Sequence, residues 1–208
     1  MSSRITPLND PINYFIKRVF DILFSLFVIA FIMSWLTPLI AILIRLESKG
    51  PIFFKQKRHG LNYEEFNCYK FRSMFVNEKA DIAEAVKNDP RITKVGAFLR
   101  RTSIDEMPQF FNVLIGNMSV VGPRPHMINF TEKYAVKVNK FKARHFIKPG
   151  ITGMAQTHGY RGEIENDTDI INRIKYDIFY MESWSLLLDL KIIYLTIINA
   201  IKGEKKAY

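Results

Sequence analysis

Two adjacent carboxylates in a basic stretch are the residues of this sequence best suited to chemistry. Asp105 and Glu106 follow Arg100 and precede Arg124, in the run RRTSIDEMPQFFNVLIGNMSVVGPRP. An aspartate can attack phosphorus as a nucleophile, and carboxylate oxygens are ligands that Mg²⁺ prefers. The alternative interpretation is structural, because acidic residues at the start of a helix stabilise its dipole.

The local pattern predicts a helix around this pair. Ser103 followed by Glu106 matches a capping box, and an apolar run then continues to Gly116, a residue type common at helix ends. Further along, Arg124 lies between two prolines, whose fixed φ angles give it a stiff backbone. Such an arginine is suited to clamping a phosphate in a fixed geometry.

Composition limits the classes of function. The 208-residue chain is long enough for one sizeable core, and its net charge of +10 favours an anionic partner: nucleic acid, a phosphorylated small molecule or an acidic membrane surface. A single cysteine, Cys68, excludes an intrachain disulfide and favours a reducing compartment. The four histidines lack the spacing of a zinc site, and the polar N-terminus predicts no cleavable signal peptide.

An apolar segment near the N-terminus predicts a membrane element. Ile22–Ile44 comprises 23 residues without a charge, enough for a transmembrane helix, but Thr37-Pro38 should bend or break it. Basic residues flank the segment on both sides, and the positive-inside rule favours keeping both flanks on the cytoplasmic side. We therefore expect a re-entrant helix that turns at Thr37-Pro38, where Thr37 bonds a freed carbonyl. The alternative is a simple span with a proline kink.

The predicted fold class is α+β, mostly helical, with a short β-hairpin in a small domain on the cytoplasmic face and amphipathic helices at the membrane interface. The hairpin joins the β-prone runs Ile52–Gln56 and Phe66–Met74. The predicted helices are Asn77–Val86, the basic segment Phe130–Phe146, Ile170–Met181 and Ser185–Ile201. The chain divides into a loose leader at 1–12, a membrane helix at 13–46 and the remaining domain at 47–208.

The second strand of this hairpin admits another interpretation. Its sequence, FNCYKFRSM, interleaves aromatic and basic residues, a pattern that can bind nucleic acid bases and phosphates. A half-buried strand with a solvated basic face explains the same alternation. A membrane-anchored nucleic-acid-binding module therefore stays open at this point, as do a scaffold without catalysis and a Mg²⁺-dependent diphosphate hydrolase.

A set of motifs in a fixed order identifies a resemblance. The chain contains KRVFD, YKFRSM, DPRITKVGAFLRRTSIDEMPQFFNVL, MSVVGPRP, KPGITGMAQ, YRGE and the tail YD…Y…WSLLLDLKII. Together, from Lys17 to Ile193, they resemble the monotopic bacterial phosphoglycosyl transferases, which are polyprenyl-phosphate hexose-1-phosphate transferases. Two departures are Thr37-Pro38 in place of a Ser-Pro pair, and Asn117 where many members have aspartate, so Asn117 is assigned no metal role.

The resemblance implies a reaction and a site. Asp105 would attack the β-phosphate of a UDP-sugar and release UMP, Glu106 would hold Mg²⁺, and polyprenyl (undecaprenyl) phosphate would then accept the sugar phosphate. The domain at 47–208 would be catalytic, and the break at Thr37-Pro38 would be the family's membrane helix break. Residues implied around the substrate phosphates are Lys70, Arg72, Arg100, Arg124, Arg161 and Asp177.

The resemblance also implies a setting. The enzyme would act at the cytoplasmic face of the bacterial inner membrane, in the first membrane step of polysaccharide or glycoconjugate assembly, with no nucleic-acid partner. The YRGE loop and the tail look closer to members that use glucose or galactose. Homo-oligomer formation, the glycan pathway, and whether the chain is complete or the catalytic part of a larger enzyme are left open by the sequence.

Overall fold

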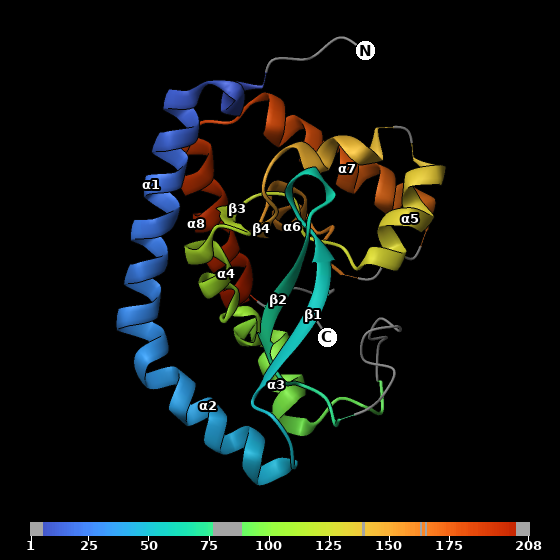
Figure 1. The fold of residues 1–208 in the computed structure, drawn as a ribbon. Helices are drawn as coiled ribbons and strands as arrows, with labels where there is room; N and C mark the ends of the chain where they lie inside the picture. Colours follow the sequence, from blue (N-terminus) through green and yellow to red (C-terminus); the bar gives the residue numbers. More distant parts are fainter. Residues whose placement is uncertain (1–5, 77–88, 139, 163, 165, 203–208) are drawn as a thin grey trace.

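A long apolar helix lies along one side of a mostly helical domain in the computed structural model (Figure 1). The structure describes residues 6–76, 89–138, 140–162, 164 and 166–202, so the helix predicted over 77–86 lies outside the described residues. The short 3₁₀ turn η1 (Pro7–Asn9) leads into α1 (Pro11–Val28), a π-helical segment η2 (Ile29–Met33) and α2 (Ser34–Glu47). By length and composition this helix could cross a membrane.

In the first half of this helix, polar side chains face the domain and apolar side chains face outward. Lys17, Asp21 and Ser25 follow one another at four-residue spacing, share one face, and are buried against the domain. Large apolar side chains are exposed instead, among them Phe15, Leu23, Leu26, Phe27, Phe31 and Trp35. A helix on the surface of a water-soluble domain shows the opposite arrangement, and an exposed apolar face of this kind is typical of a membrane or protein interaction site.

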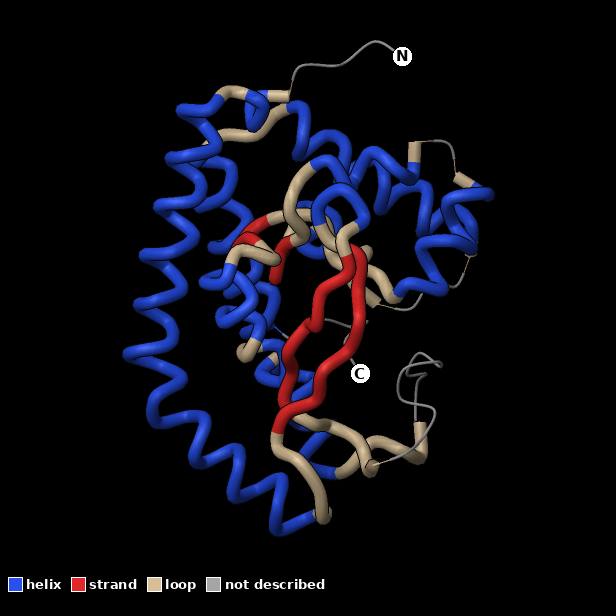
Figure 2. Tube along the Cα trace, viewed as in Figure 1, coloured by secondary structure: helices blue, strands red, loops and turns tan. Residues whose placement is uncertain are grey.

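The long helix bends and does not break (Figure 2). Pro38 lies inside α2, which stays helical to Glu47, and the irregular π-helical segment occurs upstream of the proline. Upstream of the proline, at the end of the π-helical segment, Ser34 Oγ donates to Ala30 O at 2.7 Å. The predicted break at Thr37-Pro38 is therefore corrected to a bend, because α2 continues through Pro38 to Glu47.

The predicted hairpin is confirmed with shifted ends. β1 (Phe53–His59) pairs antiparallel with β2 (Glu65–Phe71), in a register that runs from Phe53 opposite Phe71 to His59 opposite Glu65. A 3₁₀ turn, η3 (Leu61–Tyr63), joins them. Cys68 is fully buried in β2, as expected of a small strand residue.

A second, parallel strand pair was not predicted. β3 (Ser119–Val121) pairs with β4 (Gly150–Thr152), and each strand has only three residues. A Cβ atom on Gly150 would lie 2.0 Å from Gly122 N, so this close approach requires glycine. The pair fixes the start of the segment that carries Arg124.

Helices supply the rest of the domain. Those after the hairpin are α3 (Lys94–Thr102), the 3₁₀ turn η4 (Ile104–Glu106), α4 (Gln109–Ile115), α5 (Ile128–Lys137), the 3₁₀ segment η5 (Phe141–Phe146), α6 (Met154–Thr157), α7 (Asp167–Glu182) and α8 (Leu186–Lys202). The two C-terminal helices confirm the predictions for 170–181 and 185–201. The fold is therefore α+β and mostly helical, with two small sheets.

The single helix predicted over 130–146 is wrong. α5 ends at Lys137, Lys140 adopts a left-handed φ of 65°, and a separate 3₁₀ segment follows. Arg144, which a basic amphipathic helix at the membrane interface would expose, is buried. The chain reverses here because Phe141 and Tyr134 both pack into one cluster with Ile170 and Ile174 of α7.

The long helix packs on the same domain from its middle to its C-terminal end. Val28 and Met33 join the main core cluster with Phe110 and Val113 of α4, and Ile192 of α8 closes it. Further along, Ile40 and Ile44 of α2 pack with Phe71 and Leu99. One continuous hydrophobic framework thus holds the hairpin, α3 and α4 in fixed positions.

Candidate active site

The two carboxylates lie on a single tight turn between two helices. α3 ends at Thr102, Ser103 adopts a left-handed φ of 61°, and η4 carries both acids before α4 begins at Gln109. The predicted capping box is therefore wrong: the Ser103 side chain makes no cap hydrogen bond, and Glu106 N donates to Ser103 O at 3.2 Å. This reversal turns Asp105 and Glu106 inward, and both are buried.

Glu106 lies within a ring of basic side chains. Lys70 Nζ and Arg124 Nη2 each lie 2.8 Å from Glu106 Oε1, while Arg124 Nη1 lies 3.1 Å and Arg161 Nη2 3.2 Å from Oε2. Burial opposes ionisation, but the charges of Arg124, Lys70 and Arg161 outweigh it and hold the pKa of Glu106 well below its usual range. Glu106 is therefore a permanent anion that binds three cations.

Asp105 has the opposite electrostatic environment. Burial raises the pKa of Asp105 above its ordinary value, and the neighbouring charge of Glu106 adds to that effect. Lys70, Arg100 and Arg161 act against the rise without cancelling it. Two neighbouring acids whose pKa values are pushed apart are typical of a division of chemical roles. The less stabilised carboxylate, Asp105, therefore has the environment expected of a nucleophile.

The charge balance of the site favours an anionic ligand. Four basic side chains interact with the two carboxylates, which leaves a formal surplus of positive charge. These side chains are Lys70, Arg100, Arg124 and Arg161. A phosphate or diphosphate would neutralise the surplus and accept charge-assisted hydrogen bonds from the guanidinium groups.

Separate parts of the chain deliver these cations. Lys70 comes from β2, Arg100 from the last turn of α3, Arg124 from the segment after β3, and Arg161 from the loop after α6. Arg100 Nη1 lies 3.5 Å from Ser73 Oγ, next to the end of β2. The structure thus brings together four of the basic residues named from the sequence and both acids.

Two other residues implied by the resemblance are not brought to the pair. Arg72 follows the end of β2, and its guanidinium donates to Lys49 O at 2.6 Å and to Ser48 O at 2.8 Å, where it holds the end of the long helix. Asp177 forms a buried ion pair with Arg144 at 2.9 Å. Arg144 in turn donates to the carbonyl of Arg124 at 2.7 Å, so Asp177 reaches the site only through other residues.

Asn112 is a positioning residue that the sequence analysis missed. Its Oδ1 accepts a hydrogen bond from Tyr69 N at 2.9 Å, and its Nδ2 donates to Asn67 O at 2.7 Å. These bonds attach α4 to β2 beside Lys70. The available signal was an asparagine within the apolar run FFNVL. If that run packs in the core, its amide is buried and must find hydrogen-bond partners, as it does here.

The aromatic-basic strand does not present a nucleic-acid surface. Phe66 and Phe71 of β2 are buried in the core, and Lys70 is paired with Glu106. Its amide at Tyr69 is bound by Asn112. The alternation therefore serves packing on one side and the acidic pair on the other.

The acidic pair offers oxygen donors for a divalent cation. Among the residues that the structure describes, no group of three or more His, Cys, Asp or Glu side chains is placed to hold a metal ion. Asp105 and Glu106 nevertheless match Mg²⁺, which commonly takes one or two carboxylates and completes its ligand set with substrate phosphates and water. Because both oxygens of Glu106 already accept from Lys70, Arg124 and Arg161, a metal that arrives with its substrate would share Glu106 with these side chains.

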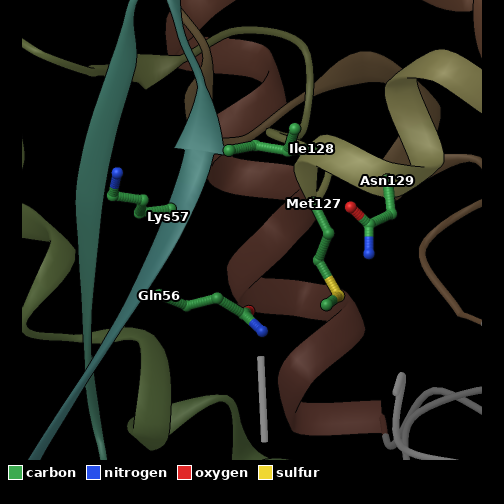
Figure 3. Close-up of a pocket in the computed structure, with 5 residues that line it drawn as sticks. All are labelled: Gln56, Lys57, Met127, Ile128 and Asn129. Carbon is green, nitrogen blue, oxygen red and sulfur yellow. The ribbon is translucent and has the colours of Figure 1, made fainter. Parts of the chain in front are cut away.

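A separate cavity of about 230 Å³ lies beside the hairpin (Figure 3). It is lined by Gln56 and Lys57 of β1 and by Met127, Ile128 and Asn129 at the start of α5. Gln56 and Met127 point toward one another across it. Its lining includes neither carboxylate and none of the four site cations, so the acidic pair is the better candidate for chemistry.

Comparison with known proteins identifies the family of this chain. Residues 12–203 match the family model described as bacterial sugar transferase. The chain is 48% identical to a UDP-glucose:undecaprenyl-phosphate glucose-1-phosphate transferase of Klebsiella pneumoniae, over 98% of this chain and 43% of that protein. It is 42% identical to the exopolysaccharide production protein PSS of Rhizobium leguminosarum bv. phaseoli, over 91% of this chain and 97% of that protein.

A third relative differs in the sugar that its name gives. The chain is 42% identical to a UDP-N-acetylgalactosamine-undecaprenyl-phosphate N-acetylgalactosaminephosphotransferase of Aeromonas hydrophila, over 94% of this chain and 46% of that protein. The chain thus spans less than half the length of the Klebsiella and Aeromonas proteins. With the family model matched over nearly its whole length, the chain belongs to the bacterial sugar transferase family.

Proposed function

We propose that this protein transfers a sugar-1-phosphate from a UDP-sugar to undecaprenyl phosphate, the initiating step of polysaccharide synthesis. The observation that carries the proposal is the acidic pair on η4, with oppositely shifted pKa values and a surplus of surrounding cations. Family membership and the names of its relatives support the same reaction class.

The proposed reaction has two steps at one phosphorus atom. An Asp105 carboxylate oxygen attacks the β-phosphorus of the UDP-sugar, and the bond to the bridging oxygen breaks, so that UMP leaves with its electron pair. An oxygen of undecaprenyl phosphate then attacks the same phosphorus, and the carboxylate of Asp105 leaves. The product is undecaprenyl-diphospho-sugar, and the enzyme regains its starting form.

The chain's own cations supply electrostatic stabilisation. Arg124, Arg161 and Lys70 already converge on Glu106, within reach of an anion bound beside it. Positioning and charge neutralisation are the main contributions a protein makes to phosphoryl transfer. Glu106 holds the cations in place, and their surplus positive charge faces the transferring phosphoryl group.

Mg²⁺ dependence is part of the proposal. Glu106 would hold the ion, with Asp105 beside it as a second hard oxygen donor. When bound, Mg²⁺ supplies further neutralisation of charge on the phosphate oxygens. The support is the chemistry of the two buried carboxylates and their placement among phosphate-binding side chains.

We further propose that the protein is seated on the cytoplasmic face of the bacterial inner membrane through the helix of Pro11–Glu47, as a re-entrant element. Two observations support this seat: the outward apolar face of α1, and the attachment of both ends of the helix to one domain through Lys17 and Glu47. The bilayer would then confine the lipid substrate to the plane in which Asp105 works. The division at 13–46 and 47–208 follows from the same seat.

The test is UMP release from a UDP-sugar in the presence of Mg²⁺, with and without undecaprenyl phosphate. UDP-glucose, UDP-galactose and UDP-N-acetylgalactosamine serve as donors. Wild type should release UMP continuously only with the lipid, and Asp105→Asn should release none because an amide cannot form the intermediate. Intact-mass detection should find a sugar-phosphate adduct on wild type when lipid is omitted. Continuous turnover without lipid would replace the transferase by a hydrolase.

Matched controls separate the site from the fold. Asn117→Asp leaves the acidic pair untouched and should retain turnover, since Asn117 has no proposed metal role. Chelation of divalent cations should abolish turnover, and added Mg²⁺ should restore it. Full activity in a chelator would remove the metal from the proposal but leave Asp105 in place.

A further inference from the structure

A buried histidine, His126, lies between two buried arginines outside the acidic pair. Arg144 Nη1 lies 2.9 Å from His126 Nδ1 and 3.0 Å from Nε2, and Arg173 Nη1 lies 3.2 Å from Nε2. His126, Arg144 and Arg173 are 7%, 3% and 5% exposed. Burying two guanidinium groups against one imidazole removes their hydration and lowers the stability of the fold unless other partners compensate. Such an arrangement is therefore a candidate for a functional role.

Each of these arginines also holds the backbone that carries a site arginine. Arg144 Nη2 donates to the carbonyl of Arg124 at 2.7 Å. Arg173 Nη2 donates to the carbonyl of Gly162 at 2.8 Å, next to Arg161. The side chains of Arg124 and Arg161 then meet at Glu106, one at 2.8 Å and the other at 3.2 Å.

The ionisation of His126 suits this position. Burial, reinforced by the charges of Arg144 and Arg173, lowers the pKa of His126 well below its ordinary value. A neutral imidazole offers a ring nitrogen as acceptor, which a guanidinium needs and a protonated ring cannot supply. Asp177, one helical turn beyond Arg173 on α7, balances part of the charge through its ion pair with Arg144.

We propose that His126, Arg144 and Arg173 form a buried positioning unit that fixes the spacing of Arg124 and Arg161 across Glu106. The unit touches neither acid of the η4 turn. It connects η5 and α7 to two loops, the segment after β3 and the loop after α6. Its ligand class follows from the proposed function: Arg124 and Arg161 clamp the diphosphate of a nucleoside-diphosphate sugar.

The test is a double-mutant cycle between His126 and Arg161, read by calorimetric binding of inorganic diphosphate and by kcat/KM for the UDP-sugar. His126→Leu removes the acceptor and should weaken both by about tenfold to a hundredfold, as expected when positioning is lost. In an Arg161→Met background, His126→Leu should reduce diphosphate affinity and kcat/KM clearly less, because the contact from Arg173 to the Arg161 loop then positions no site cation. Equal losses in both backgrounds would overturn the proposal.

Two further variants distinguish positioning from general stability. His126→Gln keeps an amide oxygen as acceptor and should recover most of the lost affinity. Arg173→Lys keeps the charge but cannot contact both His126 and Gly162, so it should also weaken diphosphate binding. That loss of affinity should be smaller in the Arg161→Met background. A lower temperature of thermal unfolding with unchanged diphosphate affinity in these variants would assign the unit a purely structural role.

The diphosphate measurement separates this proposal from the proposed function. If diphosphate binding follows the predicted cycle but no UDP-sugar is turned over, the positioning unit stands and the transferase proposal fails. If wild type turns over UDP-sugar but His126→Leu binds diphosphate as wild type does, the transferase proposal stands and the positioning unit fails. Failure of wild type to bind diphosphate would overturn the positioning unit, since no clamp would then exist.

Discussion

At the scale of single residues, the site depends on a difference between two neighbouring acids. Glu106 is bound by Lys70, Arg124 and Arg161, whereas Asp105 is buried with weaker compensation. The same burial therefore produces a strongly held anion at one position and a less stable, more reactive carboxylate at the next. Function and stability are divided between adjacent residues of one turn.

This division predicts opposite effects on stability. The folded pKa of Glu106 lies below its unfolded value, so its contribution is fully present above the unfolded pKa and is lost as pH falls through the folded pKa. At pH 7, Glu106→Gln leaves three cations without their anion and should cost about 3–5 kcal/mol. That deficit should shrink as pH falls below the unfolded pKa of a glutamate, about 4.3, because the unfolded chain then takes up a proton that folded Glu106 resists.

The matched variant is Asp105→Asn. The folded pKa of Asp105 is raised, so its ionised form destabilises the fold at neutral pH, and the neutral amide should be as stable as wild type or more so. Thermal unfolding in detergent, measured for both variants from acid to neutral pH, provides the comparison. A Glu106→Gln protein as stable as wild type at pH 7 would contradict the assigned role of Glu106.

Residue types and motif order predicted most of this site but not the roles of every member. Lys70, Arg124 and Arg161 meet at Glu106, as the motifs implied. Arg72 does not join them, because β2 ends at Phe71 and the strand alternation no longer directs the next residue. A one-dimensional pattern cannot reveal where a strand stops within a motif.

At the scale of elements, close backbone contacts bring the site segments together. α3, which carries Arg100, packs where a Cβ atom on Gly96 would lie 1.9 Å from Ser73 O. The start of this helix is also capped by Glu47 of α2, whose carboxylate accepts from Lys94 N at 2.6 Å. The hairpin end, the long helix and the acidic turn are therefore linked through the first turn of α3.

Gly96→Ala tests that link. The added methyl group has only backbone to displace, so α3 should shift and the protein should lose about 1–3 kcal/mol of stability, the usual cost of overpacking. Since α3 ends beside Ser103, kcat/KM should fall as well. The control is Lys94→Ala in the same helix, where the side chain is exposed and the change should stay within about 0.5 kcal/mol. Equal behaviour of the two variants would contradict the tight contact.

Element prediction succeeded where the signal was local and failed where the chain reverses. Gly116 ends α4 with a φ of 95°, as its residue type predicted. Ser103 and Lys140 adopt left-handed conformations that their residue types do not announce, and these reversals invalidated the capping box and the helix over 130–146. These left-handed conformations persist because the packing of the surrounding elements compensates for their cost.

At the scale of the whole molecule, one domain holds both ends of the long helix. Near the N-terminal end, Lys17 Nζ lies 2.7 Å from Asp189 Oδ2, and Arg18 donates to Val113 O at 2.6 Å. At the other end, Glu47 caps α3. Because both attachments are to the same domain (Figure 1), a bilayer contacting the exposed apolar face of the helix would leave both ends on one side.

This arrangement predicts the result of cysteine labelling in membrane vesicles of known orientation. Asn9→Cys and Lys49→Cys bracket the helix at exposed positions, and the native Cys68 is buried, so its background labelling should be low. A membrane-impermeant maleimide should label both positions from the cytoplasmic face and neither from the opposite face. Phe31→Cys, exposed on the protein but facing lipid in the proposed seat, should resist the reagent from both faces until detergent is added. Labelling of Asn9→Cys and Lys49→Cys from opposite faces would instead require a spanning helix, and the contacts of Lys17 and Glu47 with one domain could not both persist in the membrane.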